Sequence, residues 1–338
     1  MTGLNILLGA GFSKSIHNEF PTMFELTDYV RNHMDFKESL RAIDFPHNLF
    51  ASDENVNIEN WIQTLENSEI YLPDGQHIDR RKNLVKIAEN LILDYIRVAS
   101  ASLNLNNTQL LSIEKLLTSN SNILTTNYDL VLEYSMQELL IENDNDSPYA
   151  LNAGLFDLAF QRRTQTYLSG GSASDSNKFN SRVFKLHGSC DWYSHDFFGD
   201  DKFWIDVSLL KNYRFPQFSE ESRSNVRDMK AINALPTLSK NQTIGSLALR
   251  RIWKDAYKAL KKKSGLAIYG SSINVSDGIL NSLLAEALPA DTPIFIWDPN
   301  ADEVKKRIKF ISPRSNITCF KDSDLASFCT FVKSMTSS

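Results

Sequence analysis

Three residues suited to acid–base catalysis stand near the middle of the chain, each just after an apolar run. Asn127 and Asp129 follow residues 121–126, and His187 follows residues 182–186. A histidine whose pKa is about 6.5 exchanges a proton at neutral pH. Amide and carboxylate oxygens can orient a water molecule and stabilise positive charge. Together the three residues could activate a nucleophile beside a cationic centre.

Each of these residues also has a structural explanation. Asn127 and Asp129 stand just before a helix expected over residues 130–141, where Asn and Asp are favoured as N-caps. A single histidine at a strand end is more often a structural residue. Gly188, which frees the backbone after His187, and the sheet edge that His187 would share with Asn127 favour the functional interpretation.

The N-terminal residues predict a different kind of chemistry, the binding of phosphate. Residues 4–8 are apolar apart from Asn5, which is typical of a buried parallel strand. Gly9 and Gly11 follow, and such glycines let backbone N–H groups approach a pyrophosphate at the start of a helix. An ordinary strand-to-helix turn has the same pattern. The third glycine and the acidic residue of the dinucleotide fingerprint are missing, so a nucleotide would be held differently from the dehydrogenase pattern.

An apolar strand, a polar loop and a helix follow one another repeatedly along the chain. After the loops at Gly9, Asn127 and His187, two more occur at Gly270 and Asp298, before helices expected over 277–288 and 301–310. This alternation predicts an α/β fold with a doubly wound parallel sheet. All five loops would lie at the carboxyl edge of that sheet, where ligands bind.

The remaining segments predict a helical addition to this core. Amphipathic patterns over 83–99 and 110–117 indicate helices, residues 72–75 indicate a turn, and residues 246–263 indicate another helix. Polar stretches over 142–148 and 168–177 indicate loops. We therefore expect one domain over 1–338, with its core sheet from residues 1–34, 119–141, 182–192 and 264–335, and a mainly helical small subdomain from residues 35–118 and 193–245.

Composition narrows the class of protein. The chain has 338 residues, 42% of them hydrophobic, and a net charge of -5, so nucleic-acid binding is not directly indicated. The N-terminus lacks signal-peptide features, and no stretch approaches the about 18 apolar residues of a membrane helix. These features predict a soluble, cytoplasmic protein without membrane contact.

The three cysteines argue against disulfide and zinc chemistry. They are far apart and form no C-x-x-C pair, so a disulfide framework or a four-cysteine zinc site is not expected. Cys190 is close to His187, which raises the alternative of a nucleophilic thiol. A small buried apolar residue is the more common role of a cysteine.

Five motifs, taken in order, resemble those of the sirtuin-like (Sir2) family of NAD-consuming enzymes, and more closely its bacterial anti-phage defence branch. The motifs are Gly9–Ser13, Thr125–Asp129, Leu186–Gly188, Tyr269–Ser272 and Asp298–Asn300. The resemblance implies a Rossmann-like, sirtuin-type fold and NAD as substrate, with no metal required. It loosely matches Pro21 and Thr22 to a loop that covers nicotinamide.

The resemblance also implies a role for each motif. Asn127 and Asp129 would lie in the nicotinamide-ribose pocket, and His187 would be the catalytic base at the ribose hydroxyls. The residues implied in NAD binding are Gly9, Ala10, Gly11, Phe12 and Ser13 at the pyrophosphate, Thr126 and Gly188 beside the catalytic residues, Gly270, Ser271 and Ser272 at phosphate or ribose, and Asp298 and Asn300 at the adenosine end.

The missing C-x-x-C pairs separate this chain from the protein-deacylating sirtuins, which usually carry a structural zinc. This departure favours hydrolysis of NAD to ADP-ribose and nicotinamide, which would deplete NAD in anti-phage defence (abortive infection). The alternatives are an NAD-dependent protein deacylase or ADP-ribosyltransferase, and a non-catalytic module that senses NAD or ADP-ribose. Because no sensor domain is apparent, the resemblance further implies a regulated homo-oligomer or a partner ATPase of helicase-like type.

Overall fold

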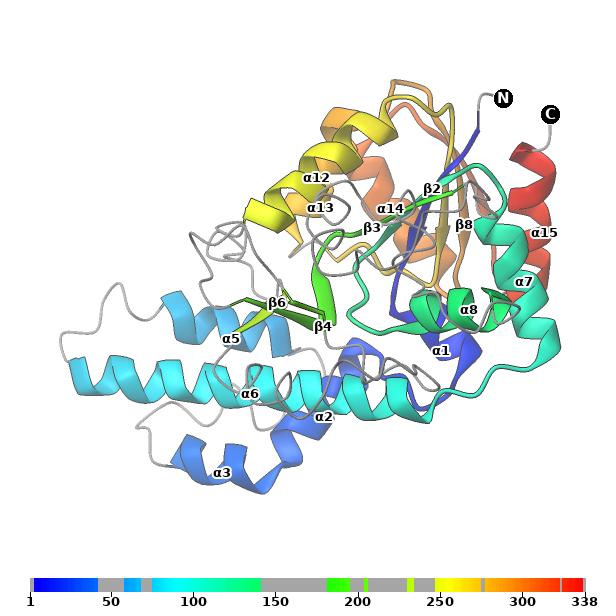
Figure 1. Ribbon diagram of the computed structural model, residues 1–338. Coiled ribbons are helices and arrows are strands. Elements are labelled where there is room, and N and C mark those ends of the chain that lie inside the picture. Colours follow the sequence, from blue (N-terminus) through cyan, green and yellow to red (C-terminus); the bar gives the residue numbers. More distant parts are fainter. Residues whose placement is uncertain are drawn as a thin grey trace.

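The centre of the protein is a parallel six-stranded sheet (Figure 1). The computed structural model describes residues 3–41, 58–67, 75–140, 181–194, 204–205, 230–233, 247–274, 277–322 and 324–336. The strands of the sheet are β1 (Asn5–Leu8), β2 (Asn122–Thr125), β3 (Arg182–Lys185), β7 (Leu266–Tyr269), β8 (Pro293–Trp297) and β9 (Asn316–Phe320). Their order is β3-β2-β1-β7-β8-β9, and every neighbouring pair is parallel. The predicted α/β fold with a parallel sheet is confirmed.

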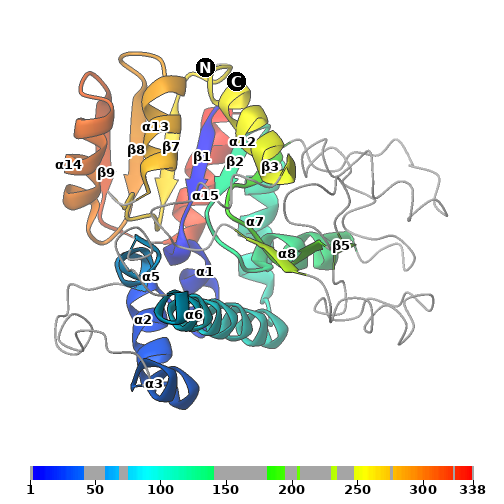
Figure 2. The same cartoon turned by 90° about the vertical axis from the view of Figure 1, so that its left-hand side faces the viewer.

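Helices cover both faces of this sheet (Figures 1 and 2). One face carries α12 (Leu247–Leu260), α13 (Gly278–Ala287) and α14 (Ala301–Ile311). The other face carries α7 (Asn107–Leu117) and α15 (Leu325–Thr336), and α8 (Val131–Leu140) packs beside α7. All four residues of β1 are buried, as expected for a strand covered on both sides.

The edge strand β9 differs from the expected fold. We expected two strands after residue 264, but β9 adds a third, beside β8. Its sequence, NITCF, lacks the continuous apolar run that marks the central strands, and its residues are half-buried or exposed.

A layer of helices lies beyond the carboxyl edge of the sheet (Figure 1). Here α2 (Met23–Asn32), α3 (Met34–Arg41), α5 (Ile58–Asn67) and α6 (Gly75–Ser102) pack against one another. The helix expected over 83–99 is the middle of the longer α6. The helix expected over 110–117 is part of α7, which packs against α15 in the sheet layers rather than in this helical layer.

The segment after β3 also differs from the expectation. We expected residues 182–192 to belong to the core sheet, with the strand ending before His187. β3 does end at Lys185, but Gly188, whose φ is 81°, starts β4 (Gly188–Ser194) in a second sheet. The second sheet is antiparallel, with β5 (Trp204–Ile205) and β6 (Lys230–Asn233) on either side of β4. The described residues of 193–245 are thus strands, not helices. The expected loops over 142–148 and 168–177 and most of the turn at 72–75 lie outside the described residues.

The path of the chain creates a switch point beside β1. The chain runs from β1 to β2 and β3 on one side, then returns to β7 on the other side of β1. The loops that leave β1 and β7 meet at the carboxyl edge, at the point where the order of the strands reverses. Such a point is where open α/β sheets bind ligands.

Candidate active site

A cavity of about 800 Å³ lies at the switch point. Thirteen of the fifteen predicted site residues line it: Gly9, Ala10, Gly11, Ser13, Thr126, Asn127, Asp129, His187, Gly270, Ser271, Ser272, Asp298 and Asn300. Phe12 does not line it, because its ring is buried in the core, edge-on to Tyr269 with the ring centroids 6.2 Å apart. Gly188 does not line it either, and begins β4. The sequence motifs are thus brought to one cavity.

The glycines of the floor allow two loops to cross in contact. The N–H of Gly9 donates to the carbonyl of Tyr269 (3.1 Å), and the N–H of Gly11 donates to that of Gly270 (2.9 Å). A Cβ on Gly11 would lie 2.7 Å from the Cα of Gly270. Gly270 itself has a φ of 58°, which favours glycine. The N–H groups of Gly9 and Gly11, expected to face a pyrophosphate, are therefore engaged within the protein.

Asn127, Ser13 and Asp129 form a chain of hydrogen bonds along one wall of the cavity. The amide Nδ2 of Asn127 donates to the Gly9 carbonyl and to Ser13 Oγ, both at 2.9 Å. Ser13 Oγ in turn donates to Asp129 Oδ2 at 2.6 Å. Side chains from α1 (Ala10–Ile16) and from the loop after β2 are thereby locked together.

Asp129 bonds the start of α8 from the residue before the N-cap position, which is Leu130, whereas Asn127 bonds Thr125, Gly9 and Ser13. Asp129 Oδ1 accepts a hydrogen bond from the Val131 N–H at the start of α8 (3.1 Å), while Oδ2 faces Ser13. Burial raises the pKa of the Asp129 carboxyl, although Lys185 and the bond from Ser13 oppose the shift. The carboxyl group thus bonds the start of α8 and also forms part of the cavity wall.

His187 occupies the tight turn between β3 and β4 and is 5% exposed. Its ring centroid lies 6.1 Å from that of Tyr128 and 6.2 Å from that of Trp253. The indole N–H of Trp253 donates to the Leu186 carbonyl (2.8 Å), which fixes this ring beside the turn. The imidazole is therefore held in an aromatic setting at the cavity wall.

Asp277 is a residue of the site that the sequence did not reveal. Its Oδ2 lies 3.2 Å from His187 Nε2, and both residues line the cavity. Its Oδ1 accepts a hydrogen bond from the Leu280 N–H and caps α13 (3.2 Å). Aspartate is common at the start of a helix because it caps the first N–H groups, so its type alone did not point to the cavity. The pairing with His187 depends on how α13 packs, which no local pattern shows.

A buried lysine lies beneath the loop that carries Asp129. Lys185 Nζ donates to the Asp129 carbonyl (2.6 Å), Glu133 Oε1 (2.7 Å) and Ser189 Oγ (2.7 Å). Burial raises the pKa of the Glu133 carboxyl to about 7, against the effect of Lys185. Burial lowers the pKa of Lys185, but the carboxylates of Glu133, Asp191 and Asp129 outweigh it and raise that pKa overall. Lys185 thus stays charged and ties the loop that carries Asp129 to the end of β3.

The thiol of Cys190 is not suited to nucleophilic catalysis. Cys190 is fully buried and does not line the cavity. Burial raises the pKa of its thiol far above the usual range, so the reactive thiolate is disfavoured. The interpretation as a small core residue fits this environment.

The other end of the cavity is formed by the loops after β7 and β8. Asp298 Oδ1 accepts a hydrogen bond from the Asn300 N–H (2.7 Å), which shapes the turn into α14. Arg307 Nη1 donates to the Ser272 carbonyl (2.6 Å) and joins the two loops. Arg307 also lines the cavity and was not expected from the sequence.

The rim nearest α2 contains Pro21 and Thr22, which line the cavity. Thr22 and Glu25 form a reciprocal capping box at the start of α2. Lys14 of α1 pairs with the same glutamate (2.5 Å). The start of α2 is thereby attached to α1 beside the glycine floor.

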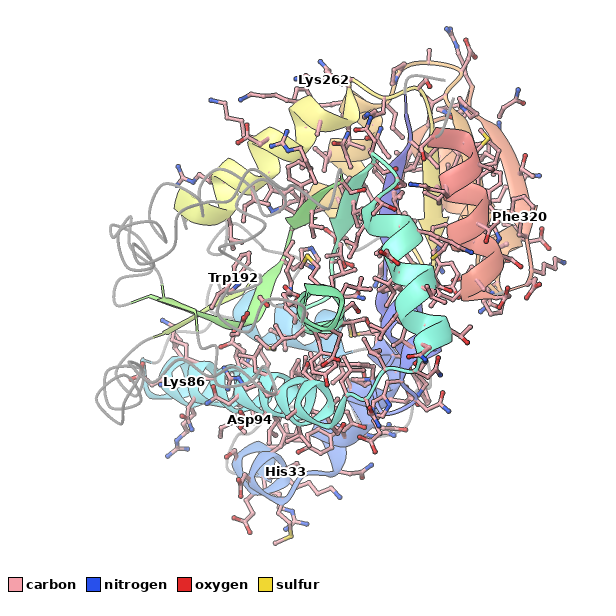
Figure 3. The ribbon with its side chains drawn as sticks, turned by 45° about the vertical axis from the view of Figure 1, so that its right-hand side comes forward. His33, Lys86, Asp94, Trp192, Lys262 and Phe320 are labelled. Atoms are coloured by element: carbon pink, nitrogen blue, oxygen red, sulfur yellow. The ribbon has the colours of Figure 1, made fainter. Side chains whose placement is uncertain are left out.

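Lysines at the end of α12 lie away from this site. Lys262 projects from the opposite, amino edge of the sheet (Figure 3). Lys263 Nζ donates to the Asn120 carbonyl (3.1 Å), and Lys261 Nζ lies 4.4 Å from the ring centre of Tyr257. These local contacts agree with a helix-end role for the lysines.

Among the residues that the structure describes, no group of His, Cys, Asp and Glu side chains is arranged to hold a metal ion. In the same part of the chain, every helix is too short or too polar to cross a membrane. No protein-family model and no curated protein matches the sequence.

Proposed function

We propose that this protein is an NAD⁺ glycohydrolase that cleaves the bond between nicotinamide and ribose, releasing nicotinamide and ADP-ribose. The observation that carries the proposal is the convergence of Asn127, Asp129 and His187 at one cavity with the loops at Ser271 and Asp298. The cavity of about 800 Å³ is within the range of small-molecule and cofactor sites. The cavity therefore suits NAD⁺ both in its size and in the placement of its polar groups.

The topology of the sheet supports a dinucleotide as the ligand. Counted along the chain, the strands of the main sheet have the order 3-2-1-4-5-6. This order is typical of Rossmann-like domains, which bind dinucleotides across the switch point. The resemblance to the sirtuin-like family, seen in five sequence motifs, supports NAD in particular.

The proposed reaction uses water as the nucleophile. Water attacks C1′ of the nicotinamide ribose while the N-glycosidic bond breaks, and the bonding electron pair leaves with nicotinamide, which becomes neutral. His187 accepts the proton that the water loses. NAD⁺ and water thus give ADP-ribose, nicotinamide and one proton.

The hydrogen-bond chain would stabilise the reacting centre. Positive charge develops on the ribose as nicotinamide leaves, and acceptor oxygens lower the energy of such a centre. The Nδ2 of Asn127 is bonded to Gly9 and Ser13, so its carbonyl oxygen is the group suited to orient water. Asp129, joined to Ser13, supplies a carboxylate on the same wall.

Product analysis tests the proposal directly. The purified protein is mixed with NAD⁺, with and without an acetyl-lysine peptide, and nicotinamide, ADP-ribose and acetyl-ADP-ribose are quantified by chromatography. We expect nicotinamide and ADP-ribose without peptide, and loss of both in Asn127→Ala and His187→Ala. His33→Ala is the matched control, because His33 lies in the outer helical layer and outside the cavity (Figure 3).

The other outcomes point to other functions. Acetyl-ADP-ribose formed only with peptide would overturn hydrolysis in favour of a protein deacylase. Saturable NAD binding without product would favour the sensing module. Full activity in both site variants would refute the assignment of the site.

From the same resemblance we propose that NAD depletion serves anti-phage defence and that assembly into a homo-oligomer controls the activity. The specific activity should then rise with protein concentration over the range in which the oligomer forms. Light scattering on the same samples would report that range. A specific activity that is constant while the oligomeric state changes would contradict this form of control and favour a partner protein.

A further inference from the structure

We propose that Asp277 is a positioning residue that orients His187 and determines which of its ring nitrogens receives a proton. The kinetic consequences of this inference rest on the proposed function, whereas the contact between Asp277 and His187 is independent of it. Asp277 Oδ2 lies 3.2 Å from His187 Nε2. The two side chains are 8% and 6% exposed, so water competes little for this contact.

The carboxylate of Asp277 is held in place from both of its oxygens. Oδ1 accepts a hydrogen bond from the Leu280 N–H in the first turn of α13, and Oδ2 faces the imidazole. Rotation of the carboxylate would break both contacts. The helix thus presents Oδ2 to His187 in a fixed direction.

The contact selects a tautomer of the neutral histidine. A neutral imidazole has one N–H and one nitrogen that accepts. If Nε2–H donates to the carboxylate, Nδ1 is the basic nitrogen that takes the proton from water or ribose. The carboxylate then also stabilises the imidazolium formed in that step, as the aspartate does in a Ser-His-Asp triad.

The imidazole has further support in its aromatic setting. The rings of Tyr128 and Trp253 both lie about 6 Å from it, tilted by 33° and 32°. Because Trp253 is anchored on the carbonyl of Leu186, the residue just before His187, ring and turn are tied together. Asp277 adds a polar contact to His187 Nε2, which the aromatic rings cannot supply.

Capping and orientation can be separated by one substitution. Asn caps a helix about as well as Asp, so Asp277→Asn should keep α13 and the melting temperature. Its uncharged amide cannot stabilise an imidazolium and can favour the other tautomer. We expect kcat to fall by about 10²- to 10⁴-fold with KM changed by less than about threefold.

The matched control is another N-cap outside the cavity. Asp324 Oδ2 accepts a hydrogen bond from the Ser327 N–H (2.7 Å) at the start of α15 and does not line the cavity. Asp324→Asn should leave kcat, KM and the melting temperature unchanged. Asp277→Ala, which removes the cap as well, should lower both kcat and the melting temperature.

A direct measurement of the tautomer keeps the inference independent of turnover. ¹⁵N NMR of the imidazoles, with His187 assigned from the His187→Ala variant, should show the Nε2–H form in the wild type above the pKa of the ring. Asp277→Asn should shift His187 toward the Nδ1–H form. An Nδ1–H form in the wild type, or an unchanged kcat in Asp277→Asn, would overturn the inference. If the wild type does not hydrolyse NAD, the proposed function fails while the NMR result still decides the role of Asp277.

Discussion

Lys185 at the end of β3 donates a hydrogen bond to the main-chain carbonyl of Asp129, 2.6 Å away in the loop after β2. The same ammonium pairs with Glu133 in α8, and both side chains are almost fully buried. A side chain of one strand thus holds the backbone that carries Asn127 and Asp129. This contact fixes the loop after β2 to the neighbouring strand β3.

Replacing Lys185 by methionine should destabilise the protein strongly. The substitution leaves Glu133 buried without its cation, and breaking a buried ion pair costs about 3–5 kcal/mol. Urea unfolding followed by circular dichroism measures the loss. Lys185→Met combined with Glu133→Gln should recover part of the stability, because both charges are then removed.

The control is Lys258→Met, which breaks an exposed pair with Asp255 and should change the stability by less than about 1 kcal/mol. Equal effects of the two lysine substitutions would contradict this account.

Gly270→Ala should force apart the β1 and β7 loops where they cross. A Cβ there would meet backbone atoms of Gly11 at 2.5–2.6 Å, and a φ of 58° is unfavourable for alanine. We expect a loss of at least about 2 kcal/mol in unfolding free energy, together with weaker NAD binding in calorimetry. The control is Gly278→Ala, where an added Cβ has no atom within 4 Å. Wild-type stability and binding in Gly270→Ala would show that the loops separate easily.

Ser13→Ala should lower both the stability and the activity of the protein. It removes the hydroxyl that accepts from Asn127 and donates to Asp129. A hydrogen bond to a charged group contributes about 1.5–3 kcal/mol, so kcat/KM for NAD hydrolysis should fall about 10- to 100-fold. Ser112→Ala serves as the control, since that hydroxyl bonds the Thr108 carbonyl within α7. A variant with normal kcat/KM would mean that the Asn127–Ser13–Asp129 chain is not needed for catalysis.

Stability should depend on the ionisation of Glu133. Its pKa is raised from the model-compound value of 4.5 to about 7 in the folded protein, mainly by burial. The folded state then binds the proton more tightly than the unfolded state, so this contribution to stability is complete below pH 4.5 and is lost as the pH rises through 7. Asp129, whose pKa is also raised, acts in the same direction.

Melting temperatures measured between pH 4.5 and 8 check this prediction. The wild type should lose more stability across this range than Glu133→Gln, which cannot ionise at that position. Glu303→Gln is the control, because Glu303 is exposed and pairs with Lys306 on the surface. The prediction is wrong if the wild type and Glu133→Gln have the same slope.

The local pattern of the sequence was sufficient for the central strands and for the rim of the site. Continuous apolar runs mark strands that are buried on both faces, and Asn5, the polar exception in β1, bonds the buried Asn122 beside it (2.9 Å). Because the carboxyl ends of parallel strands share one edge, loops far apart in sequence were expected to meet. The cavity lined by Gly9, Asn127 and His187 agrees with that expectation.

Local patterns failed where pairing with distant residues decides the structure. The edge strand β9 is half-buried and has no continuous apolar run. The loop at His187 and Gly188 was expected, but the residues after it leave the main sheet, and a small sheet forms because β5 and β6 pair with β4. Aromatic content alone did not identify those partners.

The sequence by itself determined which residue types reach the carboxyl edge, because strand periodicity and turn chemistry are local properties. Only the tertiary structure decided what those residues contact. It pairs His187 with Asp277, places Lys185 under Asp129, and directs the N–H groups of Gly9 and Gly11 into the neighbouring loop rather than the cavity. Such contacts depend on the packing of helices and strands that are far apart in the chain, and that packing leaves no periodic signal in the sequence.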